Sequence, residues 1–226
     1  MNKSNKLKAF TLSEVLITLV IIGIISAIAV PTIITSVNKN SAIEQLKKAY
    51  STLSQASSRA ISDNGPIGTW DVVSSSQEFS QTYMEPYLNT IGKKEYSTIE
   101  YKTLNNIDVP FDCYNFKLVD GTRIGIDTPD YNDSEVEGAF IVPILVDVNG
   151  DKKPNKLGRD IFTFQFYISN EISPIKVGTF LPFGHSWSRE KIKSDETFGC
   201  SRKSSGMTCA SLIMKDSWQM KADYPW

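Results

Sequence analysis

The stretch LKAFTLSEVLITLVIIGIISAIAVP, residues 7–31, decides the first part of the fold. No charged residue occurs between Glu14 and Lys39, and the apolar run exceeds the about 20 residues that a helix needs to cross a bilayer. Three lysines precede the run: Lys3, Lys6 and Lys8. Because basic residues favour the cytoplasmic side, we expect the remainder of the chain to lie outside the cytoplasm.

The carboxylate of Glu14 stands at the start of this apolar run. An unpaired carboxylate is costly to bury in a membrane, so a glutamate in this position is expected to have a partner. The residues around it, Ala9-Phe10-Thr11-Leu12-Ser13-Glu14, are followed by a long apolar segment that reaches Pro31. This arrangement resembles the N-terminal signal of type IV pilins and of type II secretion pseudopilins.

The resemblance implies that a prepilin peptidase cuts between Ala9 and Phe10 and methylates the new N-terminus. The family usually has Gly before the cut, and Ala9 departs from that pattern while remaining small. Glu14 and Pro31 would then be residues 5 and 22 of the mature chain, where the family has them. The implied organisation is a cleaved leader at 1–9, a transmembrane and filament-core helix at 10–38, and a pilin-like head at 39–226 that includes the amphipathic half of the long helix.

Assembly through the N-terminal helix follows from the same resemblance. Glu14 would offset the cationic amine of Phe10 in a neighbouring subunit, and loss of either partner would leave a costly buried charge. The implied partners are other pilin or pseudopilin copies, a prepilin peptidase, an inner-membrane assembly platform and membrane lipid. The protein would sit in the inner membrane with a single span, and form a periplasmic or surface filament after assembly.

Two alternatives remain open. An ordinary secretory signal would be cut behind the apolar segment, where Ser26-Ala27-Ile28-Ala29 offers a small-x-small site. The chain could also be a membrane-anchored monomeric binding module or adhesin that does not polymerise. The sequence does not separate a type IV pilus subunit from a type II secretion subunit.

A helical apolar pattern continues beyond the membrane segment. Apolar residues recur every three or four positions at Ile43, Leu46, Ala49, Tyr50, Leu53, Ala56, Ala60 and Ile61. We predict one long helix from about Phe10 to Ser62, bent or loosened at Pro31 and stopped by Asn64-Gly65-Pro66. Glu44 precedes Lys48 by four residues, which is the spacing of a helical ion pair.

The remainder of the chain indicates an α+β fold in which a small antiparallel sheet covers the long helix. Asp120-Gly121 lies between two strand-like segments and predicts a hairpin. The segment 161–168 has phenylalanines at every second position and is the clearest strand. Pro143 interrupts the apolar run 139–146, which favours an edge strand or a bulge. Residues 65–81 are polar and predict a loop, and apolar residues from Phe79 to Leu88 predict a short helix that ends before the polar segment 90–94.

Oxygen-bearing side chains cluster between the strands that end at Val146 and begin at Ile161. They are Asp147, Asn149, Asp151, Asn155 and Asp160. Their spacing matches the first part of a calcium loop, but Lys152 and Gly158 stand where an EF-hand has Gly and Glu. Some pseudopilins carry calcium in the head, and the resemblance therefore makes these residues calcium candidates, with an ordinary turn as the alternative. The acidic stretch 127–137 is interpreted as a solvated loop.

Cys200 and Cys209 enclose a polar segment near the C-terminus and are expected to form a disulfide in an oxidising envelope. Many pilins have a C-terminal loop bounded by a disulfide, which this segment resembles. Cys113 is left over, and the sequence does not assign it a role.

Enzymatic chemistry has little support. The single histidine, His185, is adjacent to Ser186, an unproductive arrangement for a dyad, and no nucleophile-elbow, phosphate-loop or zinc-helix motif occurs. We therefore predict no enzyme. A net charge of −1 indicates no bulk attraction to nucleic acid. Trp187, Trp218 and Trp226 are interpreted as core or rim residues, or alternatively as an adhesive patch.

Overall fold

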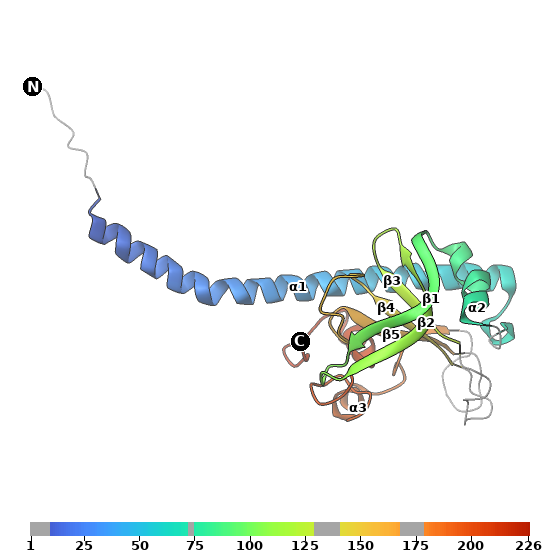
Figure 1. Cartoon of the computed structure of the whole chain (residues 1–226). Helices are drawn as coiled ribbons and strands as arrows, with labels where there is room; N and C mark the ends of the chain where they lie inside the picture. The colour runs from blue at the N-terminus through green and yellow to red at the C-terminus, as the bar shows by residue number, and fades with distance from the viewer. Residues whose placement is uncertain (1–9, 72–74, 129–140, 168–178) are drawn as a thin grey trace, which may run out of the picture. The chain divides into compact units, whose positions relative to one another are not determined.

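The computed structural model in Figure 1 describes residues 10–71, 75–128, 141–167 and 179–226. By its internal contacts the chain divides into two compact units, Met1–Asn40 and Ser41–Trp226. Helix α1, Leu12–Asn64, contributes to both. The second unit, called the head below, contains every other helix and strand.

Helix α1 has 53 residues, which confirms the predicted long helix to within two residues at each end. Its termination follows from the sequence, because Gly65 adopts a φ of +82°, a conformation that few other residues tolerate. Pro31 lies inside the helix, where it lacks the N–H that would bond to the preceding turn.

One face of α1 forms the core of the head. Its buried residues are Ala42, Ile43, Leu46, Ala49, Leu53, Ala56, Ser57 and Ala60. Tyr50 and Ile61 are partly buried beside them, so the predicted stripe is confirmed. The spacing of Glu44 and Lys48 predicts an ion pair between them, and this prediction is wrong because Lys48 has a different partner. The Nζ of Lys48 lies 2.9 Å from Oδ2 of Asp120, which ties α1 to the β2–β3 turn instead.

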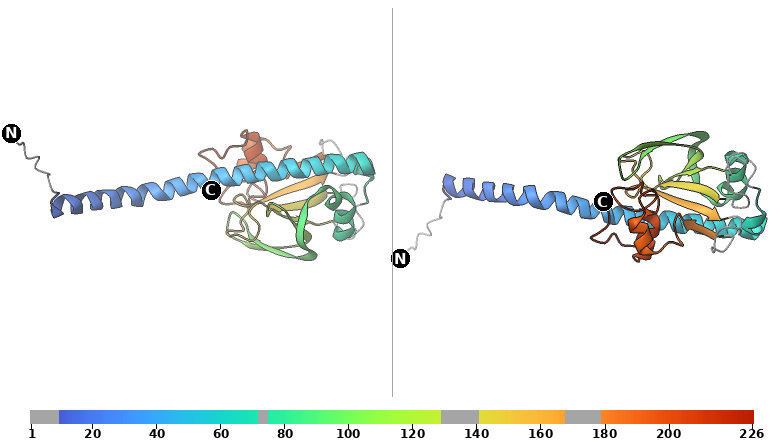
Figure 2. Two further views of the ribbon diagram at one scale, coloured as in Figure 1. Left: turned by 90° about the horizontal axis from the view of Figure 1, so that it is seen from above. Right: turned by 90° about the horizontal axis from the view of Figure 1, so that it is seen from below.

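The sheet has six antiparallel strands in the order of the sequence. They are β1 Thr90–Lys102, β2 Asp108–Leu118, β3 Arg123–Ile126, β4 Ile141–Asp147, β5 Ile161–Tyr167 and β6 Thr179–Pro182. Both views in Figure 2 show the strands along the head part of α1. This arrangement confirms the predicted α+β fold class.

The hairpin prediction at Asp120-Gly121 is confirmed, since these residues join β2 to β3. The prediction for the segment 139–146 is wrong, because β4 pairs with β3 on one side and β5 on the other. Pro143 is tolerated because it lies just past the end of the short β3. There the carbonyl of Pro143 accepts a hydrogen bond of 3.2 Å from the backbone N–H of Asp127. Because proline has no N–H, only the return bond to Asp127, the last one between β3 and β4, is lost.

In the segment 65–102, the prediction of a loop over residues 65–81 is wrong, whereas the predicted short helical segment does end before residues 90–94. Helix α2, Ser76–Tyr83, begins inside the predicted loop, at a capping box formed by Ser75 and Glu78. The polar segment after the short helix is the start of β1, the longest strand. Its residues are largely exposed because β1 is an edge strand. Short 3-10 helices, η1 Ile67–Thr69 and η2 Glu85–Tyr87, flank α2.

Strand β5 is buried along its whole length, with a hydrophobic cluster on each face. Phe162, Phe164 and Phe166 belong to the cluster that includes the buried face of α1. Ile161 belongs to a smaller cluster with Ile99, Cys113, Leu145 and Leu157. The C-terminal segment adds α3, Arg189–Ser194, and α4, Cys209–Lys215, to the larger cluster.

Candidate functional site

The N-terminal part of α1 exposes large apolar side chains along its whole length. Those more than a third exposed include Phe10, Leu12, Val15, Leu16, Ile17, Leu19, Val20, Ile21, Ile22, Ile24, Ile25, Ile28, Val30, Ile33, Ile34 and Val37. A surface of this kind is not stable in water and needs lipid or protein to cover it. Among the described residues, α1 is the one helix long and apolar enough to cross a membrane.

Three threonine hydroxyls in this segment, those of Thr18, Thr32 and Thr35, bond to carbonyls of the helix itself. Thr18 Oγ1 donates to the carbonyl of Val15 at 2.9 Å, and Thr35 Oγ1 donates to the carbonyl of Pro31 at the same distance. Each of these threonine hydroxyls therefore has a partner within α1 and needs none from water or lipid. The threonines are thus compatible with an apolar environment.

Glu14 has a partner within its own chain. The backbone N–H and the hydroxyl of Thr11 each donate to Oε2 of Glu14 at 2.8 Å, and the N–H of Glu14 lies 3.3 Å from the hydroxyl oxygen of Thr11. This is a capping box, in which the residue before the helix and the third helical residue satisfy each other's backbone N–H groups. The Thr-x-x-Glu spacing signals such a box, and sequence reasoning missed it.

Phe10, expected at the processing site, and Glu14, expected in assembly, both lie at this capping box. Phe10 directly precedes the cap and has an exposed fraction of 86%, and the Glu14 side chain is also exposed. A carboxylate has more acceptor sites than the two bonds from Thr11 use, so Glu14 retains capacity for a cation. Ala9 lies outside the described residues, and Pro31 lies further along α1.

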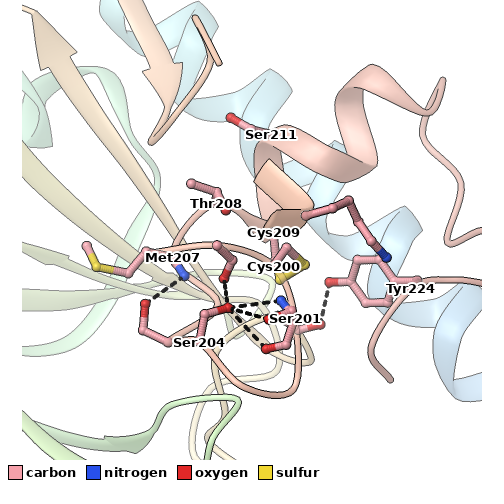
Figure 3. Close-up of a disulfide and its surroundings, with 12 residues drawn as sticks. Cys200, Ser201, Ser204, Met207, Thr208, Cys209, Ser211 and Tyr224 are labelled. Atoms are coloured by element: carbon pink, nitrogen blue, oxygen red, sulfur yellow. Dashed lines mark hydrogen bonds between the residues drawn. A yellow bond between two sulfur atoms is a disulfide. The ribbon is translucent and has the colours of Figure 1, made fainter. Parts of the chain in front are cut away.

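The structure joins Cys200 and Cys209 in the expected disulfide, and both residues are fully buried (Figure 3). Inside the loop, the hydroxyl of Ser204 donates to the carbonyl of Gly199 at 2.7 Å. Two hydrogen bonds fix the loop to its surroundings: the N–H of Leu104 donates to the carbonyl of Ser205 at 2.8 Å, and the hydroxyl of Thr163 donates to the carbonyl of Met207 at 2.6 Å. Gly158 packs against the disulfide, since a Cβ there would come within 2.7 Å of the Cys209 sulfur.

Cys113 is buried elsewhere, in the smaller cluster, and is a free thiol. Burial raises its pKa to about 12, so the thiol remains protonated and unreactive at neutral pH. Its place in the core gives it a packing role.

Hydrogen bonds join four of the five calcium candidates in the turn between β4 and β5. Asp160 accepts hydrogen bonds from the N–H groups of Asn155 and Lys156 at 2.8 and 2.7 Å, and from the side-chain amide of Asn149 at 3.1 Å. Asp147 accepts from the N–H of Asn149 at 3.1 Å. The fifth candidate, Asp151, is exposed and forms ion pairs with Lys117 and Arg123 instead.

Hydrogen-bond donors thus already occupy the two buried carboxylates of this turn, and the third carboxylate faces two cations. Within the described residues there is no group of three or more His, Cys, Asp or Glu side chains placed to hold a metal ion. The buried side-chain oxygens of Asn149 and Asn155 have no hydrogen-bond partner, which is the one observation in favour of an ion. As arranged, the residues do not fit calcium, and calcium binding stays a prediction.

The electrostatics of the turn are unusual for a surface loop. Asp147 and Asp160 are 2% and 4% exposed. Burial, and secondarily the negative charge of Asp160, raises the pKa of Asp147 to about 7. Burial also raises the pKa of Asp160, although the hydrogen bonds that its carboxylate accepts oppose this effect. The turn therefore holds one proton near neutral pH more readily than an exposed loop would.

The remaining sequence candidates lie apart from this turn. His185 is half-buried, and burial together with the charge of Lys215 lowers its pKa. The three tryptophans pack against different neighbours: Trp187 against Phe183 and Lys191, Trp218 against Tyr50, and Trp226 against Arg159. In the acidic stretch, Asp127 accepts a hydrogen bond from Ser76, and residues 129–137 lie outside the described residues.

Comparison with known protein families matches two models that together span almost the whole chain. The prokaryotic N-terminal methylation motif matches residues 4–30, and a family of unknown function, DUF6613, matches residues 32–226. No curated protein and no solved structure matches the chain. The first match covers the cleavage motif and most of the exposed apolar helix, so the N-terminus is a prepilin-type signal. The chain therefore belongs to the DUF6613 family, and it is a pilin-like or pseudopilin-like protein.

Proposed function

We propose that this protein is a structural subunit of a filament, either a type IV pilus or the pseudopilus of a type II secretion system, and that it assembles through α1. The observation that supports this most strongly is the exposed apolar surface of α1 directly behind a prepilin-type signal. Lipid can cover this surface before assembly, and the same surface of other copies can cover it afterwards. The same signal implies a structural role and not an enzymatic one.

Processing would act on Ala9 and Phe10. A prepilin peptidase would cut between them and methylate the amine of Phe10, leaving a cationic N-terminus one residue before the capping box. Glu14 of a neighbouring subunit would then offset this charge. Such a pair adds little net stability, but a mismatch would leave a charge unpaired in an apolar filament core, so the pair would fix the register of assembly.

The proposed location is the inner membrane, with one span and with the head outside the cytoplasm. An assembly platform would pass subunits from lipid into a periplasmic or surface filament. The energy would come from a cytoplasmic ATPase that this chain does not contain. The competing proposal is a membrane-anchored monomer that uses its head as a binding module and never polymerises.

The decisive experiment separates sheared filaments from membranes in cells that hold the matching assembly machinery, and detects the chain in each fraction. A filament subunit should appear in both fractions, and chemical cross-linking of the filament fraction should give ladders of two or more copies or mixed ladders with other subunits. A chain found only in membranes, and cross-linked to nothing, would favour the anchored monomer.

A further inference from the structure

A groove in the head runs along α1 and has a volume of about 590 Å³. Its lining comes from a stretch of α1 and from a single residue near the C-terminus: Lys47, Tyr50, Ser51, Ser54, Gln55, Ser58, Arg59 and Trp218. It lies wholly within the unit Ser41–Trp226 and shares no residue with the processing motif. The groove is therefore separate from the surface through which a filament would assemble.

An uncommon backbone conformation holds Trp218 at this groove. After α4 ends, Ser217 and Trp218 have φ values of +58° and +60°, which residues other than Gly rarely adopt, least of all in succession. Their N–H groups donate to the carbonyls of Met214 and Ile213 at 3.1 and 2.8 Å. The tryptophan ring then lies with its centre 5.6 Å from that of Tyr50. Such outliers are retained where the surrounding structure requires them, often at ligand clamps.

Several polar side chains contribute to the lining of the groove. Three serine hydroxyls and one amide line it, and the amide of Gln55 donates to the hydroxyl of Ser51 at 3.0 Å. The hydroxyl oxygen of Ser54 is enclosed and has no hydrogen-bond partner. A hydroxyl left without a partner is costly, so a ligand that reaches it, after a rotation of the serine side chain, would gain a hydrogen bond that the protein lacks.

The charges of the groove are all positive. Lys47 and Arg59 are exposed, and neither takes part in an ion pair within the described part of the chain, whereas the neighbouring Lys48 is paired with Asp120. Their positions on α1 differ by about 18 Å along the helix axis. No acidic side chain lines the groove.

We propose that this groove binds a short acidic oligosaccharide. Trp218 provides an apolar face for a sugar ring, and Tyr50, which stacks on Phe164 and Phe180, supports it from the core. The serines and Gln55 bond to sugar hydroxyls, and Lys47 and Arg59 pair with carboxylate or sulfate groups. A single-stranded nucleic acid fits less well, because such a ligand stacks successive bases on several aromatic side chains, whereas the lining offers Trp218 as its one aromatic platform beside serine hydroxyls.

The test uses the full chain in micelles of a detergent that has no sugar headgroup. The probes are an oligogalacturonate, a neutral maltooligosaccharide of equal length, and an oligothymidylate, each titrated by calorimetry. The groove variants are Trp218→Ala and Arg59→Gln. The matched controls are Trp187→Ala and Arg202→Gln, which remove an aromatic ring and an exposed cation outside the groove. Arg59 is exposed, so Arg59→Gln should unfold at the same temperature as the wild type. This variant therefore still tests the proposal if Trp218→Ala does not fold.

We expect the oligogalacturonate to bind the wild-type protein at least about tenfold more tightly than the maltooligosaccharide, with affinity falling as salt is raised. Each groove variant should weaken this binding at least about tenfold, and the controls should leave it unchanged. Four results would each overturn the proposal: no binding by the wild type, equal binding of the neutral probe, tighter binding of the oligothymidylate, or no effect of the groove variants. If the head self-associates and the groove variants abolish this self-association, the groove binds a second copy of the chain and the oligosaccharide proposal is wrong.

Discussion

Thr11 and Glu14 hold each other at the start of α1, with two hydrogen bonds of 2.8 Å from Thr11 to a single carboxylate oxygen of Glu14. Glu14 therefore has two separable properties. Its oxygen atoms satisfy the backbone of its own helix, and its charge is available to a neighbouring amine. A Glu14→Ala variant would lose both properties at once, so it would not show which of them assembly requires.

Two substitutions separate the cap from the charge. Glu14→Gln keeps an acceptor that can complete the capping box but removes the charge. If charge pairing drives assembly, this variant should insert into the membrane normally and be reduced at least about tenfold in the sheared filament fraction. Thr11→Ala weakens the cap by about 1 kcal/mol and keeps the charge, so it should still assemble. Immunoblots of both fractions measure the outcome, and normal incorporation of Glu14→Gln together with loss of Thr11→Ala would assign Glu14 to capping alone.

The processing site makes a prediction that mass spectrometry decides. The mature protein should begin with N-methylated Phe10. Ala9→Arg should block cleavage by placing a bulky cation before the cut, and Ala29→Leu should have no effect, because it alters only the alternative secretory site. A mature chain that starts after Ala29 would instead show that the apolar helix is removed, and the filament proposal would fail with it.

How far the sequence predicted the structure depends on whether each signal is local. The stripe from Ile43 to Ile61 specifies α1 by itself, and Asp120-Gly121 specifies its hairpin, so both predictions were correct. The capping boxes at Thr11 and Ser75 are equally local and were simply overlooked. Both boxes follow the Ser/Thr-x-x-Glu spacing, so the sequence alone is sufficient to predict them.

Other features depend on contacts that the sequence does not display. Strand β1 is polar because it is an edge strand, and its place in the sheet is set by pairing with β2. Pro143 fits a central strand only because β3 is short. The groove needs Trp218 beside Tyr50, residues far apart in the chain, which no local pattern brings together. In the calcium-like turn, Asp151 matched the spacing but pairs with Lys117 on β2.

Loss of the disulfide should destabilise the head without abolishing its fold. The bridge closes a short loop, and the chain-entropy estimate for a loop of this size is about 2–3 kcal/mol. The double variant Cys200→Ser/Cys209→Ser should therefore unfold at a lower denaturant concentration than the wild type. A reducing agent should shift the wild type to a similar midpoint and leave the double variant unchanged. A wild-type midpoint insensitive to reduction would mean that the loop is held by its hydrogen bonds and by the packing on Gly158.

Asp147 should make the stability of the head depend on pH in a direction opposite to that of most carboxylates. Its pKa is about 7 in the folded chain and near its ordinary value of 3.8 when unfolded. The folded state therefore binds the proton more tightly, and the stabilising contribution is present below about pH 4 and is lost as the pH rises toward 7. Asp147→Asn keeps an oxygen for the N–H of Asn149 but never ionises. At pH 8 this variant should be more stable than the wild type by roughly 1–3 kcal/mol, and the difference should vanish in acid.

The same variant decides whether calcium binds in this turn. An ion held by Asp147 would raise the melting temperature of the wild type at pH 8, a chelator would reverse the rise, and Asp147→Asn would remove it. Asp151→Asn is the matched control, because Asp151 lies on the same turn but points to Lys117 and Arg123, so it should leave any calcium effect in place. If neither calcium nor chelator shifts the wild type, while Asp147→Asn is more stable at pH 8, the two buried carboxylates and their hydrogen bonds account for the turn without a metal. If Asp147→Asn is less stable than the wild type at pH 8 even in chelator, the charge of Asp147 is favourable in the fold and its raised pKa is wrong.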